Sequence, residues 1–186
     1  MLFRSSAFVS GSLAVNVLAG GAVIDSNGQN VTISTSLTGS GGLIKRGLGT
    51  LTLSNSNTIT GSTSIFAGRV KLANASALPT SSVTPLAGGT MELSPYLVTT
   101  VAGLKPNAGG LVDVSNGALT VASGLSATDL VNAIISGRNG GTWDGTAGIT
   151  SSVSAAQVAA SELRAVGWLD NGDGSLAVAY AAQGDT

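Results

Sequence analysis

The sequence predicts an all-β chain that winds into a parallel β-helix (a solenoid) and ends in a small α+β cap of short helices and a β-hairpin. The first observation is a glycine followed at once by a four-residue strand pattern. It recurs at intervals of 21, 26, 21 and 21 residues, at Gly21, Gly42, Gly68, Gly89 and Gly110. A further strand pattern follows nine or ten residues after four of these glycines, around Val31, Leu51, Val98 and Leu119. Periods in this range are typical of solenoids, so we interpret each period as one coil.

The residues after each glycine predict which side chains face inward. The second residue is apolar in every repeat, and we expect one interior column of Val23, Ile44, Val70, Met91 and Val112. The third residue is charged in four of five repeats, and we expect an outward row of Ile24, Lys45, Lys71, Glu92 and Asp113. Side chains alternate between the two faces of a strand, which separates the two sets. Each buried aliphatic side chain contributes about 1.5–3 kcal/mol and an exposed ion pair only about 0–1 kcal/mol, so the inner column decides the fold.

Composition excludes several classes of function. The chain has 186 residues, 9% of them charged, and a net charge of −1, so it has no basic field to attract nucleic acid. It has no cysteine and no histidine, which excludes disulfides, Cys/His zinc sites and catalysis that depends on imidazole. We therefore expect no metal and no cofactor.

The chain divides into three expected regions: residues 1–19, 20–122 and 123–186. The first is either an extra coil or a signal-like segment, since Arg4 precedes an apolar run from residue 7 to 19 that also alternates as a strand does. The second is the β-helix repeat region. Within it, we expect a loop bulging from the stack between Asn74 and Pro85, because Pro79 and Pro85 cannot donate to a strand ladder.

One segment of the repeat region resembles a known family. Residues 43–54 (Leu-Ile-Lys-Arg-Gly-Leu-Gly-Thr-Leu-Thr-Leu-Ser), 57–63 (Asn-Thr-Ile-Thr-Gly-Ser-Thr) and 67–72 (Ala-Gly-Arg-Val-Lys-Leu) resemble the autotransporter-associated β-strand repeat, also called the passenger-associated transport repeat. Its signature here consists of Gly42, Lys45, Gly47, Gly49, Gly61 and Gly68, whereas Ile59 replaces an aromatic residue and Arg46 a small one. The resemblance implies a right-handed β-helix in an exported or surface-anchored bacterial protein. It implies no catalytic residues.

The C-terminal region, residues 123–186, predicts a cap for the last coil. Ser126 begins a helix that ends at Gly137, with an apolar face of Leu130, Val131, Ile134 and Ile135, and a second helix begins near Ser154. Residues 164–169 and 175–180 alternate as the strands of a hairpin. This region is similar to the tail of secreted bacterial repeat proteins that continue into dockerin-like calcium modules, and residues 184–186 match the beginning of such a module.

Three features of the sequence are candidates for a metal, catalytic or ligand-binding site. Residues 170–174 (Asp-Asn-Gly-Asp-Gly) contain carboxylates, but glycines occupy the third and fifth positions and no glutamate follows, so we predict a turn and no calcium site. Glu92 and Asp113 on adjacent coils are a candidate acid/base pair of the kind that glycosidases use. Trp143, Asp144 and Trp168 form a candidate ligand-contacting surface, although the tryptophans also suit anchoring of the cap.

The leading hypothesis is a monomeric, non-enzymatic stalk or passenger segment of a bacterial cell-surface protein, associated with the outer membrane. Its expected partners are other modules of a longer polypeptide or a surface polysaccharide. One alternative is a carbohydrate-binding or carbohydrate-cleaving β-helix. Another is an adhesin that binds a receptor on a host or neighbouring cell.

Overall fold

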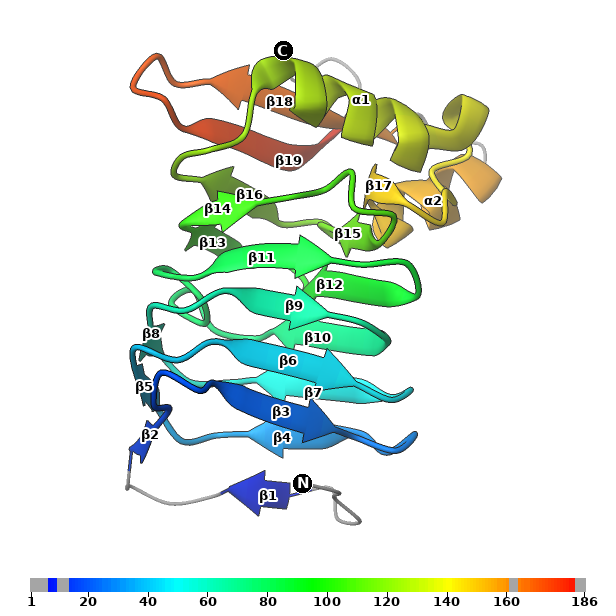
Figure 1. Cartoon of the computed structure of the whole chain (residues 1–186). Helices are drawn as coiled ribbons and strands as arrows, with labels where there is room; N and C mark the ends of the chain where they lie inside the picture. Colours follow the sequence, from blue (N-terminus) through cyan, green and yellow to red (C-terminus); the bar gives the residue numbers. More distant parts are fainter. Residues whose placement is uncertain (1–6, 10–13, 161–163, 183–186) are drawn as a thin grey trace.

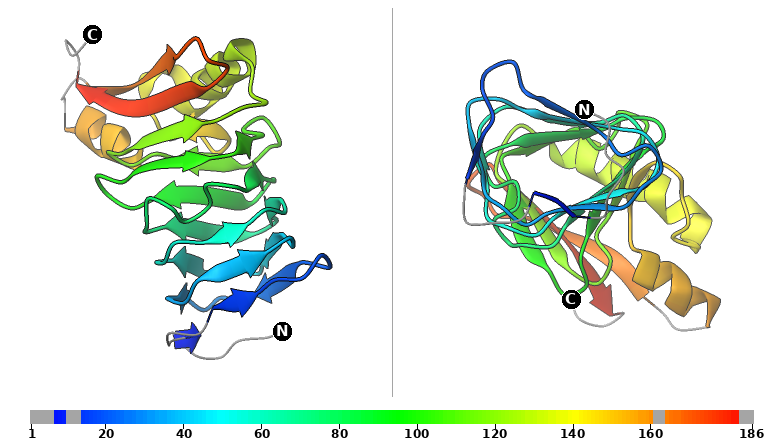
Figure 2. Two further views of the ribbon diagram at one scale, coloured as in Figure 1. Left: turned by 90° about the vertical axis from the view of Figure 1, so that its left-hand side faces the viewer. Right: turned by 90° about the horizontal axis from the view of Figure 1, so that it is seen from below.

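A computed structural model describes residues 7–9, 14–160 and 164–182 of the chain (Figure 1). These residues form a β-solenoid in which parallel strands stack coil on coil, with two short helices and a hairpin at the C-terminal end. Seen along the axis, successive coils superimpose around one interior (Figure 2). The predicted fold class is therefore confirmed.

Each complete coil has three faces. One face is a seven-stranded sheet, in the order β1 (Ala7–Val9), β4 (Val31–Ile33), β7 (Thr50–Leu53), β10 (Gly68–Leu72), β12 (Gly89–Leu93), β15 (Leu111–Asp113) and β17 (Gly148–Thr150). The next is a five-stranded sheet of β14 (Gly103–Leu104), β11 (Ser82–Pro85), β9 (Thr63–Ile65), β6 (Leu43–Arg46) and β3 (Ala22–Asp25).

The third face consists of two sheets. The three-stranded sheet contains β2 (Val15–Asn16), β5 (Leu37–Gly39) and β8 (Thr58–Ile59). The four-stranded sheet contains β13 (Val98–Val101), β16 (Ala118–Val121), β19 (Leu176–Ala182) and β18 (Arg164–Asp170). Strands β1 and β2 each pair in parallel with a strand of the following coil, which is the geometry of an additional coil. The remaining residues of the expected signal-like segment, 1–6 and 10–13, lie outside the described residues.

The expected interior column is wrong in two of its five members. Val70, Met91 and Val112 are register partners on the seven-stranded sheet and are fully buried. Val23 and Ile44 lie on the five-stranded sheet and point outward, and Val23 is 45% exposed. The 26-residue interval is the cause, because between Gly42 and Gly68 the glycine repeat moves from one face of the solenoid to another.

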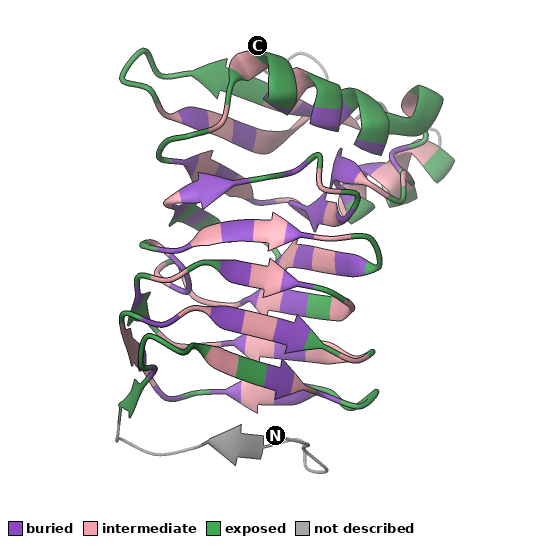
Figure 3. Ribbon diagram, in the orientation of Figure 1, coloured by how far each residue is buried: buried purple, intermediate pink, exposed green. Residues whose placement is uncertain are grey.

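The actual column follows the seven-stranded sheet. Its register partners are Val31, Leu51, Val70, Met91, Val112 and Ile149, each at most 1% exposed. Successive members up to Val112 are 20, 19, 21 and 21 residues apart, which is the true length of a coil. Along most strands, buried residues alternate with more exposed ones, as the stripes in Figure 3 show.

Residues 73–81 stay inside the stack, which corrects the expectation of a bulging loop. Ala77 and Leu78 are fully buried. The Asn57 N–H donates to the Ser76 carbonyl at 2.9 Å, and the Thr99 hydroxyl donates to the Ala75 carbonyl at 2.7 Å, so the segment bonds to the coils on both sides. In this coil the third face therefore has no strand. Its place is taken by a segment that buries two apolar side chains and offers carbonyls to the coils on both sides. Pro85 is the last residue of β11, where its missing N–H does not interrupt the ladder. Its carbonyl accepts from the Gly110 N–H at 3.2 Å.

The C-terminal elements continue two sheets of the solenoid. Helix α1 (Ala127–Arg138) begins at the predicted cap, where the Ser126 hydroxyl accepts from the Asp129 N–H at 3.1 Å. It lies across the end of the stack and packs on β17, which extends the seven-stranded sheet (Figure 1). Strands β18 and β19 form the predicted antiparallel hairpin, and β19 pairs with β16. The short helix α2 (Ser152–Ala159) contacts β18.

The buried face of α1 differs from the predicted one. Leu130 and Ile134 are buried as expected, but Ile135 is 62% exposed. The remaining buried residues are Ala133 and Gly137. At Gly137 a Cβ would overlap the Ile149 carbonyl oxygen. Small residues therefore allow α1 to approach β17 closely. The spacing of large apolar residues does not predict a contact of this kind.

Candidate functional site at the repeat corner

The corner between β6 and β7 encloses a lysine ammonium. Lys45 is fully buried, and its Nζ donates to the carbonyls of Arg46 at 2.8 Å, Gly47 at 2.6 Å and Ala67 at 3.3 Å. An ammonium has three donors, and here each has a carbonyl acceptor. The first two carbonyls belong to the turn after β6, whereas Ala67 belongs to the following coil. The side chain therefore ties two coils together from the inside.

The interior position of Lys45 corrects the prediction of an outward charge. Its register partners Ile24 and Ile65 also point inward, so lysine replaces an aliphatic side chain in this row. Burial lowers the pKa of Lys45, and the nearby carboxylate of Asp25 opposes this effect. The chain tolerates a buried amine because backbone carbonyls take the place of water.

Three glycines shape the walls of this corner. Gly47 and Gly49 adopt φ values of +70° and +92°, in the left-handed region that favours glycine. Gly68 has φ +68°, and a Cβ there would lie 2.5 Å from the Gly49 oxygen, 2.6 Å from the Gly47 oxygen and 3.0 Å from the Lys45 Nζ. The three positions together leave room for the ammonium and for a close approach of two coils.

The other signature glycines lie at a different corner, where the third face meets the five-stranded sheet. A Cβ on Gly42 would overlap the Ser62 carbonyl, and one on Gly61 would overlap the Gly42 amide. Next to them, Thr63 and Ser81 are buried and share a hydroxyl–hydroxyl hydrogen bond of 2.9 Å. Successive backbones thus meet here without intervening side chains.

Asn57 is a second buried polar residue that joins coils, and it is not among the signature residues that the sequence indicated. It is 2% exposed; its side-chain oxygen accepts from the Leu37 N–H at 2.8 Å, and its Nδ2 donates to the Ala77 carbonyl at 2.8 Å. Leu37, Asn57 and Ala77 are spaced by 20 residues, so one amide bridges three coils. The sequence pattern that could have indicated this role is the spacing itself, because polar Asn57 lies one coil length from apolar Leu37 and from apolar Ala77.

The candidate ligand surface is divided by the structure. Trp143 is 4% exposed and belongs to the core, and its carbonyl accepts from the Thr150 hydroxyl. Asp144 is exposed, and hydrogen bonds from Thr142 and Asn139 lower the pKa of its carboxyl. Trp168 lies on β18 and is 44% exposed. Only Trp143 and Asp144 share a cleft, which has a volume of about 370 Å³.

The candidate carboxylate pair is adjacent, but both members are engaged. Glu92 and Asp113 are register partners. Glu92 forms ion pairs with Lys71, at 2.9 Å, and with Arg69. Burial acts to raise the pKa of Glu92, but these two cations outweigh it and the pKa is lowered.

Asp113 is 6% exposed, and its Oδ1 accepts from the N–H groups of Ser115 at 2.8 Å and Ser152 at 2.9 Å. It therefore anchors the first turn of α2. Lys71 and Glu92 face outward as predicted, whereas Asp113 is covered by the start of α2.

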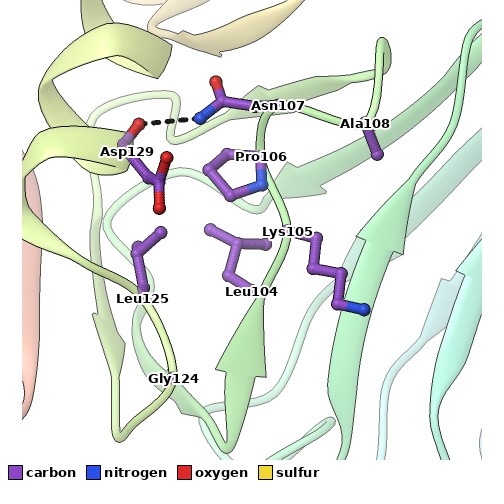
Figure 4. A pocket seen from close by; sticks show the side chains of 8 residues that line it. All are labelled: Leu104, Lys105, Pro106, Asn107, Ala108, Gly124, Leu125 and Asp129. Atoms are coloured by element: carbon purple, nitrogen blue, oxygen red, sulfur yellow. Dashed lines mark hydrogen bonds between the residues drawn. The ribbon is translucent and has the colours of Figure 1, made fainter.

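A second cleft, of about 390 Å³, lies between the residues after β14 and the start of α1 (Figure 4). The Asn107 amide donates to the Asp129 carbonyl at 3.0 Å, and the Lys105 ammonium points away from the cleft. The Asp129 carboxylate accepts from the Ser126 hydroxyl at 2.7 Å. These polar groups serve the helix start. Within the part of the chain that the structure describes, no cluster of three acidic residues has the geometry to hold a metal ion.

The repeat corner coincides with a known family signature. Residues 43–72 match the passenger-associated-transport-repeat. The comparison with curated proteins and the comparison with solved structures returned no match. They give no support to the dockerin-like resemblance of the C-terminal region, and its expected start, residues 184–186, lies outside the described residues.

The matched repeat extends from β6 through β10, which is one coil and the first half of the next. Its polar members Lys45, Asn57 and Thr63 all form hydrogen bonds that cross between coils. Its glycines occupy the two corners where backbones approach. The repeat is a structural one, and in this chain several of the matched residues join one coil to the next. In the residues covered by the structure, no helix is long and apolar enough to cross a membrane.

Proposed function

We propose that this chain is a non-enzymatic, β-solenoidal segment of a passenger region in an exported bacterial surface protein. One observation carries the proposal: the repeat matched at residues 43–72 occupies the coils of a continuous parallel ladder. Such a segment serves as a rigid spacer. It is rigid because the N–H and C=O groups of each coil pair with those of the next coil. The segment spaces or displays other modules outside the cell.

Stacking also supplies a driving force that suits passage through an outer membrane. A coil that emerges buries its column residue and pairs with a coil already folded. Each buried aliphatic side chain contributes about 1.5–3 kcal/mol, so sequential stacking opposes backsliding of the chain. This role needs no ligand and no cofactor.

The proposal is tested by placing the full chain between a bacterial signal peptide and the membrane-translocating domain of an autotransporter. Surface exposure is measured by external protease digestion and antibody labelling of intact cells. Met91→Asp buries a charge in the interior column, whereas Thr90→Asp places the same charge on the outward side of the same strand. We expect the Met91 variant to lose most of its surface signal and the Thr90 variant to retain it.

Two results oppose the proposal. If the unaltered chain does not reach the surface, the passenger role is wrong. If Met91→Asp is displayed as well as Thr90→Asp, stacking does not assist transport, even though the solenoid still serves as a spacer.

A further inference from the structure

The turn after β6 has the geometry of a cation site. The oxygens of Arg46, Gly47 and Ala67 converge at 2.6–3.3 Å on the Nζ of the fully buried Lys45, although Arg46 itself is exposed and Gly47 and Ala67 are half-buried. Potassium-channel filters hold their ions in the same way, with backbone carbonyls that replace the hydration shell. In this chain the position of the ion is occupied by the Lys45 Nζ.

The acceptors differ in their dependence on the lysine. The Arg46 carbonyl also accepts from the Ser26 N–H at 3.2 Å. For the Gly47 and Ala67 carbonyls, the Lys45 ammonium is the donor at 2.6 Å and 3.3 Å. Without the lysine these two half-buried carbonyls lose that donor, so an empty site should destabilise both coils.

The neighbouring coils have apolar side chains at the position equivalent to Lys45. Ile24 and Ile65, the register partners of Lys45, are buried and carry no donor. A hydroxyl of the preceding coil bonds to another carbonyl of the Lys45 turn: the Ser26 Oγ donates to the Leu48 carbonyl at 2.6 Å. Carbonyls of the Arg46–Gly49 turn therefore accept from side chains of two coils, from Lys45 of their own coil and from Ser26 of the preceding one.

We infer that the Arg46–Gly49 turn and Ala67 form a site for a primary ammonium group, that Lys45 is its built-in occupant, and that filling it couples residues 43–53 to residues 63–72. The coupling follows from the source of the acceptors, because Gly47 precedes β7 whereas Ala67 precedes β10. The ammonium is fully bonded only when both coils are in place. This inference concerns assembly of the solenoid and holds whether or not the chain is exported.

The inference is tested by chemical rescue in the full chain. Lys45→Ala removes the equivalent of propylamine and leaves the carbonyls in place. We expect a lower urea midpoint, and we expect added n-propylammonium chloride to raise it in a saturable manner. At a concentration 100 times its Kd, a ligand that binds only the folded state reduces the unfolding equilibrium constant about 100-fold.

Matched controls separate the site from general effects. Lys71→Ala removes the same side chain from the outer face, where its ammonium pairs with Glu92 at 2.9 Å, so it should show no rescue. Sodium chloride at equal ionic strength controls for salt, and 1-propanol controls for size without the charge. Equal responses of the two alanine variants to n-propylammonium overturn the inference.

Two further measurements apply if Lys45→Ala does not fold. Lys45→Met keeps the apolar stem but donates no hydrogen bond; it should unfold at lower urea and speed amide exchange at Arg69, whose N–H donates to the Gly49 carbonyl across the coils at 3.0 Å. A methionine variant as stable as the wild type overturns the inference. In the unaltered chain, an amine acylating reagent should modify Lys71 and Lys105 well before Lys45, and equal labelling contradicts an occupied interior site.

Discussion

A methyl group at Gly68 should destabilise the solenoid far more than one at Gly28. Both glycines are left-handed, with φ values of +68° and +80°. An alanine in this conformation costs about 1–2 kcal/mol, and this cost is common to both substitutions. At Gly28 nothing lies within 4 Å of the added Cβ. Gly28→Ala should therefore lose only about 1–2 kcal/mol.

At Gly68 the added Cβ meets backbone oxygens of the neighbouring coil. The oxygens of Gly49 and Gly47 would lie at 2.5 and 2.6 Å, and neither is the end of a flexible side chain. Relief requires the two coils to separate, which weakens the Arg69–Gly49 bond of 3.0 Å and the Lys45–Ala67 bond of 3.3 Å. A neutral hydrogen bond contributes about 0.5–1.5 kcal/mol and one to a charged group about 1.5–3 kcal/mol. Gly68→Ala should therefore lose about 3–6 kcal/mol in total.

The assay is equilibrium urea unfolding of both variants, followed by far-UV circular dichroism and tryptophan fluorescence. The midpoint should fall much further for Gly68→Ala than for Gly28→Ala, with similar slopes if both remain two-state. Equal losses would refute the reasoning, because they would mean that only backbone conformation matters and that the close approach of the coils at Gly68 carries no energy.

Three further predictions use contrasts within the chain. Leu51→Ala should cost about 2–5 kcal/mol because Leu51 is fully buried, whereas Leu48→Ala, at a side chain 71% exposed, should change stability by about 0.5 kcal/mol or less in urea unfolding. The pKa of Glu92 is lowered in the folded state, so the folded chain binds fewer protons than the unfolded one; the stability from this group should be lost as pH falls below 4.5, and Glu92→Gln should lack this loss in unfolding measured against pH. Iodide should quench the single tryptophan of Trp143→Phe strongly and that of Trp168→Phe weakly, since Trp168 is 44% exposed and Trp143 only 4%; equal quenching would contradict the buried position of Trp143.

Much of the architecture follows from local patterns in the sequence. Glycines with positive φ, alternating strands and a serine helix cap depend on neighbouring residues, so a single sequence contains them. The hairpin of β18 and β19 is of this kind, and its turn closes with the Asn171 N–H donating to the Ser175 carbonyl at 3.2 Å. The predicted turn at residues 170–174 is thereby confirmed.

The assignment of strands to faces does not follow from local patterns. An alternating strand has two sides, and a shift of one residue exchanges inside for outside. Val23 and Ile24 show this: both are aliphatic, so hydrophobicity does not decide between them, and in the structure Ile24 faces inward beside Lys45 of β6. The charge of Lys45 favoured an outward orientation, because the hydration of an ammonium normally outweighs the burial of its aliphatic stem. The carbonyls that reverse this balance come partly from Ala67, 22 residues away.

These corrections explain why the recognisable signature lies in polar and glycine positions. The interior column accepts Leu51, Val70 and Met91 in adjacent coils, because apolar contacts depend mainly on area and volume. Lys45 and Asn57, in contrast, must present donors to particular carbonyls of another coil, and a shift by one residue would leave those carbonyls unpaired. Hydrophobic burial thus holds the solenoid together, whereas the buried polar groups fix its register. A repeat that folds one coil at a time needs both, since a coil that stacks out of register displaces every coil that follows.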